Sequence, residues 1–307
     1  MRSALHRVTD SDTFRRFTKR GPGRLVYRSR AFERLDLARN DVLSRNAVRR
    51  DPGFFDDVRT FGFFVGHNKS GTSMVGGLLD AHPNVIMADE IDALKYVEAG
   101  LSRDQLFYLL LKGSRSEARK GRVTARRLTP YSYAVAGQWQ GKVTTPIVVG
   151  DGKSGTSTRR LGADLSLLDR LPDEMPGVAV RLIQVIRNPF DPISVMMVRG
   201  GRSFRNAVDH YFTACEVLLE IRRRVDPGAL LAVRYETFVA YPQGELTTAC
   251  RFLGVEPDAG YLEACARVIR REPDRSREMV VWPRRWINEV HQRIFDFDFL
   301  EGYRYDS

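Results

Sequence analysis

The stretch Phe61–Val85, FGFFVGHNKSGTSMVGGLLDAHPNV, decides the fold of this 307-residue chain. Its first residues, Phe61–Val65, are apolar and predict a short buried strand. A loop of small and polar residues follows from Gly66, and an amphipathic helix is predicted from about Thr72. The first N–H groups of a helix have no intrahelical partner, and the helix dipole is positive there. The stretch therefore predicts a loop that binds a phosphate-like group.

The side chains of this loop strengthen the prediction of an anion site. Lys69 supplies a full positive charge, and the hydroxyls of Ser70, Thr72 and Ser73 supply further hydrogen-bond donors. A Walker A loop places its lysine directly after the second glycine. Here that glycine is Gly71 and Thr72 occupies the lysine position, which argues against an enzyme that binds Mg-ATP or GTP.

The run KSGTS (69–73), followed after a helix by Leu79–Val85 (LDAHPNV), resembles the 5′-phosphosulfate loop of sulfotransferases. Such enzymes use 3′-phosphoadenosine 5′-phosphosulfate (PAPS) as the donor and release 3′,5′-adenosine bisphosphate (PAP). The resemblance implies that the loop binds this cofactor and that no metal is needed. The implied cofactor ligands in the loop are His67, Asn68, Lys69, Ser70, Gly71, Thr72 and Ser73.

A second set of implied ligands follows Val180–Ile186, an apolar run that predicts a strand buried on both faces. The sequence RNPFDPIS (187–194) resembles the sulfotransferase element that binds the 3′-phosphate of PAPS, where an arginine fork and a serine hydroxyl converge on one phosphate. Arg187 and Ser194 are the matching residues. The family pattern places the serine one residue later than this chain does, and a pairing of Arg187 with Asp191 is the structural alternative.

Two segments nearer the C-terminus resemble the same family. The sequences VRYE (233–236) and CRFLGV (250–255) match a stretch that we expect to be structural, with a glycine that ends a helix. The sequence DRSR (274–277) resembles a basic loop that closes over the nucleotide in bacterial sulfotransferases. Arg275 and Arg277 are therefore implied 3′-phosphate ligands, and a solvated basic loop is the alternative.

The catalytic residues are assigned through the resemblance. Transfer to an alcohol requires removal of its proton, and in several sulfotransferase families a glutamate soon after the H-P-x-[IV] segment is the base. Glu90 matches that placement best, Asp89 is the alternative base, and a role in starting a helix is the structural alternative for Glu90. Lys69 is expected to neutralise charge on the leaving 5′-phosphate oxygen. Lys153 matches a family lysine beside the sulfuryl group, and His82 is expected to be structural.

The composition is that of an ordinary globular protein, with 43% hydrophobic residues. No run approaches the ~18 apolar residues needed to span a membrane, and no apolar h-region follows the first residues. The 3 cysteines and 5 histidines show no metal-ligand or redox spacing. We therefore expect a reduced, metal-free, cytoplasmic protein.

The positive charge of the chain is concentrated at its N-terminus. Of the net charge of +11, residues 1–50 carry +9, from 14 Lys/Arg and 5 Asp/Glu. Such an arm can bind nucleic acid or an anionic membrane surface. Apolar residues such as Leu35 and Val42 interleave with the arginines, so we expect a solvated flank instead. Residues 1–58 are interpreted as a basic N-terminal extension and residues 59–307 as the sulfotransferase domain.

Strands and helices alternate along residues 59–307, which indicates an α/β fold with a central parallel sheet flanked by helices on both faces. The predicted strands cover residues 61–65, 85–87, 146–149, 180–186 and 230–235, with helices at 90–99, 159–170 and 204–225. Ligands of such sheets bind beyond the carboxyl ends of the strands, where every motif above falls. The resemblance implies a P-loop NTPase-like sulfotransferase fold with a mostly helical C-terminal part. Residues 101–145 are interpreted as an irregular insertion and an acceptor-site lid, with Tyr131, Tyr133 and Trp139 as candidate stacking residues.

These observations favour a PAPS-dependent sulfotransferase that transfers a sulfuryl group to a hydroxyl, or less favourably an amine, of a small-molecule or carbohydrate acceptor. A P-loop kinase or NTPase is the alternative enzyme. It is disfavoured by the missing lysine and by the lack of an evident Mg²⁺-binding carboxylate on the third strand. A non-catalytic nucleic-acid or membrane-binding protein is the third interpretation, but it accounts only for residues 1–50. No nucleic-acid partner is expected.

Overall fold

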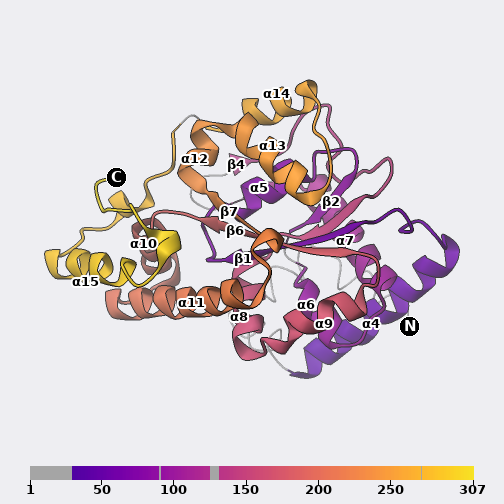
Figure 1. Cartoon of the computed structure of the whole chain (residues 1–307), viewed down its shortest axis with the longest axis horizontal. Coiled ribbons are helices and arrows are strands. Elements are labelled where there is room, and N and C mark those ends of the chain that lie inside the picture. Colours follow the sequence, from indigo (N-terminus) through magenta and orange to yellow (C-terminus); the bar gives the residue numbers. More distant parts are fainter. Residues whose placement is uncertain (1–29, 90, 125–130, 271) are drawn as a thin grey trace. The chain divides into compact units, whose positions relative to one another are not determined.

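The computed structural model describes residues 30–89, 91–124, 131–270 and 272–307 (Figure 1). The chain divides into two compact units, Met1–Asp51 and Pro52–Ser307. In the first unit the described part is one helix, α4 (Arg30–Arg50), in which Arg45 pairs with Asp41 at 2.7 Å. Most of the predicted basic arm lies outside the described residues. None of the described helices is both long enough and apolar enough to cross a membrane.

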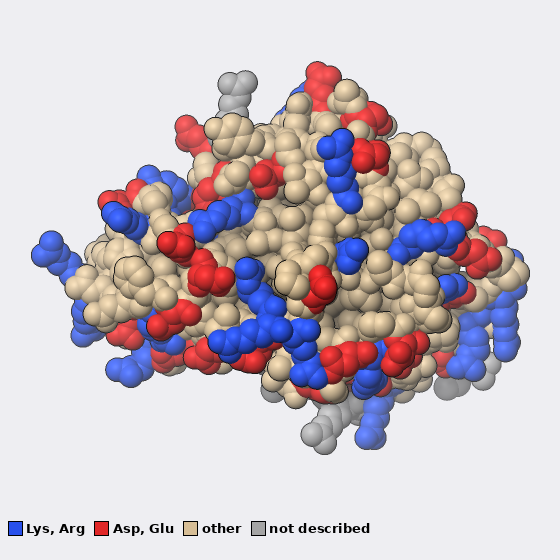
Figure 2. All heavy atoms as spheres, viewed as in Figure 1, with Lys and Arg blue, Asp and Glu red and all other residues tan. Residues whose placement is uncertain are grey.

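Charged side chains after residue 50 are nearly balanced and carry the remaining net charge of +2. Figure 2 shows Lys and Arg interspersed with Asp and Glu over the face in view. Several arginines of the second unit pair with acids at the surface, as Arg223 does with Glu220 at 2.6 Å and Arg251 with Glu256 at 3.0 Å. Exposed pairs of this kind contribute ~0–1 kcal/mol each, so they balance charge more than they hold the fold.

The second unit is built on a five-stranded sheet in the order β2-β5-β1-β6-β7, and every neighbouring pair is parallel. This confirms the predicted α/β class. The strands are β1 (Thr60–Gly66), β2 (Val85–Ala88), β5 (Val148–Asp151), β6 (Ala179–Ile186) and β7 (Leu230–Arg234). The third predicted strand is shifted by two residues and ends on Asp151. The earlier interpretation that this strand carries no carboxylate at its end is therefore wrong.

The central strand, β1, is apolar on both faces because helices cover both faces of the sheet. Phe61, Phe63 and Phe64 are fully buried. Next to β1, the backbone of β5 approaches so closely that a Cβ at Gly150 would lie 2.3 Å from the carbonyl oxygen of Gly62. Only glycine fits at position 150, and this close contact fixes the register of the two strands on which the site is built.

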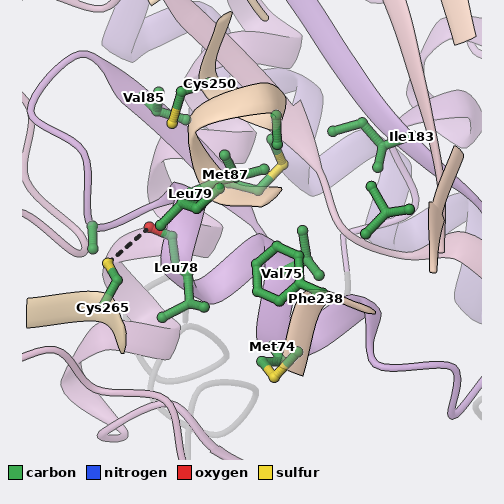
Figure 3. Close-up of a cluster of buried hydrophobic side chains, with 14 of the residues drawn as sticks. Met74, Val75, Leu78, Leu79, Val85, Met87, Ile183, Phe238, Cys250 and Cys265 are labelled. Atoms are coloured by element: carbon green, nitrogen blue, oxygen red, sulfur yellow. Dashed lines mark hydrogen bonds between the residues drawn. The ribbon is translucent and has the colours of Figure 1, made fainter. Parts of the chain in front are cut away.

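One face of the sheet is covered by α5 (Thr72–Leu79), α12 (Tyr235–Ala240), α13 (Pro242–Leu253) and α14 (Ala259–Arg267), which lie together in Figure 1. Figure 3 shows the core between these helices and the sheet, where Leu78, Met87, Ile183 and Phe238 are buried in one cluster. Gly254 ends α13 with a φ of 89°, so the predicted glycine cap is present.

The other face is covered mainly by α8 (Ser154–Ala163) and α11 (Phe204–Arg224), which pack on β1, and by α7 (Arg103–Arg119), which packs on β2 and β5. The predicted helix over residues 159–170 is in fact two helices, α8 and α9 (Ser166–Glu174). The chain breaks at Asp164, whose carboxylate accepts hydrogen bonds from the N–H group and hydroxyl of Ser166 and so starts the second helix. The remaining elements are α6 (Ala93–Glu98), α10 (Phe190–Gly200), α15 (Arg284–Ile294), η1 (Pro227–Ala229), η2 (Ser276–Met279) and η3 (Asp298–Leu300).

The expectation that residues 101–145 are irregular is wrong over α7 (Arg103–Arg119). Ser102 and Gln105 form a capping box at its start, and Phe107 and Leu110 on its inner face are fully buried. Basic residues of this helix such as Arg115 and Arg119 are exposed and are not part of this apolar face. A short hairpin follows, formed by β3 (Val123–Thr124) and β4 (Tyr131–Ser132).

The described part of the hairpin packs along α5. The chain after it runs beside the residues that precede β2 and then leads into β5. The Trp139 N–H donates to the Ala81 carbonyl at 3.1 Å, and the Thr144 N–H donates to the Pro83 carbonyl at 2.8 Å. A Cβ at Gly77 of α5 would lie 3.3 Å from the Tyr133 Cβ. The lid and the stacking role of these aromatic residues stay predictions.

Candidate functional site

The loop after β1 is fixed at its first residue by a side chain from the opposite helix. Thr158 of α8 accepts a hydrogen bond from the Gly66 N–H at 2.8 Å and donates one to the Gly66 carbonyl at 3.1 Å. Both backbone groups are thereby satisfied where the chain leaves the sheet. The loop then turns through Lys69, which adopts a left-handed φ of 73° and is exposed together with Asn68.

The loop ends at Gly71, which is the N-cap of α5. Its φ of 99° favours glycine, and a Cβ there would lie 2.4 Å from a ring carbon of Tyr235. A glycine cap offers no side chain to the first N–H groups of the helix, so these groups and the helix dipole remain available to an anion. Ser70 and Thr72 flank this point and are buried, and Ser73 is half-buried.

A second helix begins beside the first loop. Lys153 is the N-cap of α8, and the hydroxyl of the next residue, Ser154, lies 3.4 Å from both the Thr72 hydroxyl and the His67 carbonyl. A Cβ at Gly155 would lie 2.5 Å from the Asn68 side chain. The N-termini of α5 and α8 therefore meet at the loop, and Lys153 stands at the start of the second helix, while its role beside a sulfuryl group stays a prediction.

His67 is a structural member of the loop. Its ring stacks on Tyr211 of α11 with centroids 3.8 Å apart, and Nε2 donates to the Tyr211 carbonyl at 2.8 Å. Burial lowers the pKa of His67 to about 4, so the ring is neutral at neutral pH. Its side chain therefore contributes packing, and any contact it makes with an anion comes from the backbone.

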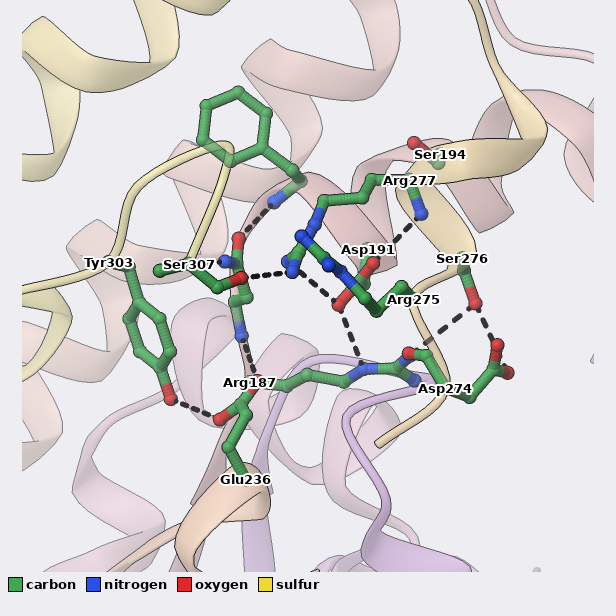
Figure 4. A network of polar contacts seen from close by, with 12 residues as sticks. Arg187, Asp191, Ser194, Glu236, Asp274, Arg275, Ser276, Arg277, Tyr303 and Ser307 are labelled. Carbon is green, nitrogen blue, oxygen red and sulfur yellow. Dashed lines mark hydrogen bonds and ion pairs between the residues drawn. The ribbon is translucent and has the colours of Figure 1, made fainter. Parts of the chain in front are cut away.

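Arg187, at the carboxyl end of β6, joins the loop to the second half of the site (Figure 4). Its Nη1 donates to the Lys69 carbonyl at 3.1 Å, its Nη2 donates to the Asp274 carbonyl, and its guanidinium lies 4.7 Å from the centroid of the Tyr235 ring. The side chain also pairs with Asp191 at 3.4 Å. The structural alternative of an Arg187–Asp191 pair is thus present, in a place that also touches the loop.

The two basic residues implied near the C-terminus differ in burial. Arg277 is 4% exposed, and its N–H group donates to Asp191 at 2.8 Å while its guanidinium contacts Asp191 and the Ser307 carbonyl. Arg275 is exposed and pairs with Glu278 at 3.3 Å. Asp191 thus bridges Arg187 and Arg277. Burial still raises the pKa of this carboxyl more than the two arginines lower it.

Ser194 follows Asp191 by one turn of α10 and lies beside Arg277 in Figure 4. It is fully buried, and its hydroxyl accepts a hydrogen bond from the Trp282 indole at 3.0 Å. That bond ties α10 to the segment after η2. The hydroxyl therefore has a partner within the fold, and its contact with a 3′-phosphate stays a prediction.

The acidic side of the site lies at the ends of β2 and β5. Glu90, the residue that the resemblance implied as the base, lies outside the described residues. Asp89 is half-buried directly after β2. His82 is tied down elsewhere, since Nδ1 accepts from the Asn84 N–H and Nε2 bonds the Glu256 carbonyl, both at 3.1 Å, which suits its expected structural role.

Sequence reasoning missed Asp151 as a site residue. It is fully buried at the end of β5, beside the strand that carries the loop, and burial raises its pKa to about 7. The signal was present in the sequence GDGK (150–153), where an acid stands between two glycines directly after an apolar run.

Comparisons with known proteins agree with this architecture. Residues 168–259 match the model of the sulfotransferase family. The structure is similar to the sulfotransferase domain of the Synechococcus PCC 7002 olefin synthase, at 20% identity and a TM-score of 0.50, over 78% of this chain and 96% of that one. It is also similar to the sulfotransferase domain from the curacin biosynthetic pathway, at 14% identity and a TM-score of 0.50, over 78% of this chain and 99% of that one. No curated protein matches the sequence.

The matched residues 168–259 include β6, Arg187 and β7, which form the second half of the site. At these identities the structural likeness shows the fold alone, and it confirms the sulfotransferase fold that the resemblance implied. The family match over residues 168–259 and the shared fold agree with the sulfotransferase resemblance of the sequence.

Proposed function

We propose that this chain transfers a sulfuryl group from PAPS to a hydroxyl, or less favourably an amine, of a small-molecule or carbohydrate acceptor. The observation that carries the proposal is the contact between Arg187 and the loop, at 3.1 Å from the Lys69 carbonyl. It unites a helix N-terminus, an exposed lysine and buried arginines at one edge of the sheet. PAPS carries a phosphosulfate and a separate 3′-phosphate, and two adjoining anion sites suit that pair of charges.

Unsatisfied donors at the second half of the site support the proposal. The Nε atom of Arg277 is buried and has no hydrogen-bond partner among the described residues, and the buried Nε atom of Arg187 meets none beyond its 3.4 Å ion pair with Asp191. An unpaired buried donor costs ~1–3 kcal/mol, or more when it is charged. Phosphate oxygens accept arginine donors strongly, so a bound 3′-phosphate would remove this cost.

Another donor of Arg187, its Nη2, contacts the neutral carbonyl group of Asp274. An anionic oxygen is a stronger acceptor than a carbonyl. A phosphate bound beside Arg187 would therefore compete favourably for this donor.

The donor carries its sulfuryl group on a phosphate, which is the leaving group. In the transfer, the bond from sulfur to the acceptor oxygen forms. The bond from sulfur to the phosphate oxygen breaks, and its electron pair stays on PAP. Lys69 is placed on the loop to balance that charge, and Lys153 steadies the sulfuryl oxygens. The acceptor's proton passes to a carboxylate of the turn after β2, which is Glu90 or Asp89.

One observation favours a nucleotide hydrolase or kinase instead. Asp151 stands at the end of the strand next to β1, where a carboxylate can bind Mg²⁺ beside a phosphate loop. Against this, Thr72 replaces the lysine that a Walker A loop requires. The first experiment therefore has to compare the two classes of nucleotide directly.

That experiment is a calorimetric titration of the purified protein with PAP in the absence of metal, with ADP and Mg-ATP as comparison ligands. We expect micromolar binding of PAP and much weaker binding of ADP, since ADP lacks the 3′-phosphate. Tighter binding of Mg-ATP than of PAP would overturn the sulfotransferase proposal in favour of the kinase.

We also place the protein in the cytoplasm. The proposal is supported by Cys215, Cys250 and Cys265, which are all buried free thiols, as expected where thiols stay reduced. Fractionation of cells that express the chain with an epitope tag tests this. Recovery in an oxidising compartment would contradict it.

A further inference from the structure

Asp151 has an unpaired carboxylate oxygen inside the site. Its side chain is fully buried, its Oδ2 accepts from the Ala93 N–H at 2.7 Å, and its Oδ1 has no hydrogen-bond partner among the described residues. Buried side-chain oxygens are paired in the large majority of cases. Ligands of parallel sheets bind at the carboxyl ends of the strands. A buried oxygen that is unpaired at this edge is therefore expected to have a functional reason.

The turn above Asp151 is held from two sides. Ala93 begins α6 and is bound by Asp151, while the preceding residue, Asp92, is bound by Arg160 of α8 through Nε at 3.1 Å and Nη2 at 2.7 Å. Asp92 adopts a left-handed φ of 65°, a conformation that costs on the order of 1–3 kcal/mol in a non-glycine residue. The bonds from β5 and α8 therefore maintain a strained turn in a fixed position.

Asp89 directly follows β2 and lies next to Asp151. In the sheet, Asp151 pairs with Ala88, the residue before Asp89, and the Gly152 N–H donates to the Ala88 carbonyl at 2.7 Å. A Cβ at Gly152 would lie 3.5 Å from Asp89 Oδ1. The two carboxylates thus stand at the ends of adjacent strands, with Asp151 buried and Asp89 half-buried.

The charges around Asp151 come from each element packed against it. Burial is the main cause of its raised pKa, and the negative charges of Asp92 and Asp89 raise it further, while the Ala93 N–H and Lys153 lower it. An interaction between two titrating groups acts equally on both. If the charge of Asp89 favours a proton on Asp151, the charge of Asp151 favours a proton on Asp89.

We infer that Asp151 is a positioning residue for sulfuryl transfer: its buried carboxylate stands beside Asp89 at the ends of adjacent strands and makes the Asp89 carboxylate a better acceptor for the proton of the attacking group. The inference rests on the proposed function and deepens it, since it assigns the proton to Asp89 and gives that residue a buried partner. The proton leaves the acceptor oxygen as its bond to sulfur forms, and PAP departs with the electron pair of the broken bond.

A merely structural role for Asp151 makes a different prediction for Asp151→Asn. The amide oxygen of asparagine still accepts the Ala93 N–H, so the turn keeps its hydrogen bond. Only the negative charge is lost. A variant that folds and binds PAP normally but transfers slowly therefore separates the effect of charge from the effect of support.

The experiment follows the release of PAP from PAPS, with water as the acceptor, across a pH range on both sides of neutral. Asp151→Asn is compared with the wild-type protein and with Asp80→Asn. Asp80 is a matched control because it is also a fully buried aspartate with a raised pKa, about 6, but lies at the far end of α5. PAP affinity is measured for each protein by calorimetry.

We expect Asp151→Asn to lower kcat by roughly tenfold to a hundredfold, with KM for PAPS and PAP affinity unchanged. The ionisation near neutral pH should disappear from its pH–rate profile but remain in that of Asp80→Asn. A wild-type profile and rate in Asp151→Asn, with PAP binding intact, would overturn the inference and leave the proposed function standing. Failure of the wild-type protein to bind PAP would overturn both.

A second measurement does not depend on activity or on the folding of Asp151→Asn. Infrared titration of the Asp80→Asn protein, which lacks the signal of Asp80, follows the buried carboxyl bands of Asp151 and Asp191. Asp191 is the internal reference, because Asp89 is not among the charges that shift its pKa. Adding Asp89→Asn should move the midpoint of the Asp151 band to lower pH, because a neighbouring negative charge is removed. An unchanged midpoint would show that the two carboxylates do not interact and would overturn the inference.

Discussion

The Nη1 atom of Arg187 donates a hydrogen bond to the carbonyl oxygen of Lys69 at 3.1 Å, which joins the end of β6 to the loop after β1. The same guanidinium lies over the ring of Tyr235, and that ring fills the space beside Gly71. These four residues come from three strand ends and form one packed unit. The shape of the loop therefore depends on a residue that lies more than a hundred positions away in the sequence.

We expect Arg187→Ala to lose most of the affinity for PAP. The variant removes both a donor to phosphate and the hydrogen bond that holds the loop, and a charged hydrogen bond contributes ~1.5–3 kcal/mol. Arg187→Lys should recover little, because lysine lacks the planar fork. Titration calorimetry with PAP measures both, and Arg181→Ala, on the same strand but packed against Phe252, is the matched control. Equal PAP affinity in Arg187→Ala and Arg181→Ala would contradict the assignment.

The glycine that starts α5 gives a second prediction. In Gly71→Ala the added Cβ would lie 2.4 Å from the Tyr235 ring in a backbone conformation that alanine rarely adopts. The loop has to move, so we expect weaker PAP binding and a lower melting temperature. Gly244→Ala is the control, since it meets nothing within 4 Å. The double variant Gly71→Ala with Tyr235→Ala removes the contact between the new Cβ and the Tyr235 ring, but residue 71 keeps its strained φ. The melting temperature should therefore recover only in part.

The fold and the strand–loop–helix stretch of β1 and α5 were predictable from the sequence because they depend on local pattern. The apolar run before Gly66, the small residues of the loop and the helix after it lie within one short stretch, and their order predicts a strand, an anion loop and a helix. Arg187 was predictable for the same reason, since it directly follows an apolar strand. Each of these signals is carried by adjacent residues.

The rest of the site depends on contacts that no local pattern carries. The seventeen residues of α7 were missed because basic side chains on its outer face obscured the buried Phe107 and Leu110. The partner of Ser194 is Trp282, which lies far along the chain. Asp151 was read as part of a loop because the strand before it is shifted by two residues. Such features arise from tertiary packing, which decides where a strand ends and which side chains meet.

A buried ion pair ties α5 to the residues after α7 and gives a prediction on stability. Asp80 accepts hydrogen bonds from Ser114 at 2.7 Å and the Met87 N–H at 2.7 Å, and its carboxylate pairs with Arg122. We expect Arg122→Met to destabilise the protein by roughly 3–5 kcal/mol, because it leaves a buried carboxylate without its countercharge.

Urea unfolding measures this loss. The double variant Arg122→Met with Asp80→Asn should be more stable than Arg122→Met alone, since no buried charge remains. A double variant no more stable than the single one would show that Arg122 acts through packing and not through its charge. Arg251→Met, which breaks the exposed pair with Glu256, is the control and should change the free energy of unfolding by less than ~1 kcal/mol.

The raised pKa of Asp151 predicts how stability depends on pH. The folded protein holds the proton of this carboxyl up to a pKa of about 7, whereas the unfolded chain releases it near the ordinary aspartate pKa of 3.8. The folded state thus binds more protons between these values, so the stability contributed by Asp151 is complete below pH 3.8 and falls as pH rises towards 7. In Asp151→Asn the amide at position 151 does not ionise in this pH range, so this dependence of stability on pH is absent.

The variant should therefore gain stability over the wild-type protein as pH rises from about 4 to about 7, by as much as roughly 4 kcal/mol at the upper end. Urea unfolding at a series of pH values measures the difference between the two free energies. Asp173→Asn, at an exposed position of α9, is the control and should show a difference that does not change with pH. A pH-independent difference for Asp151→Asn as well would mean that Asp151 ionises normally, and the charge that we assign to it in transfer would then be present at every working pH.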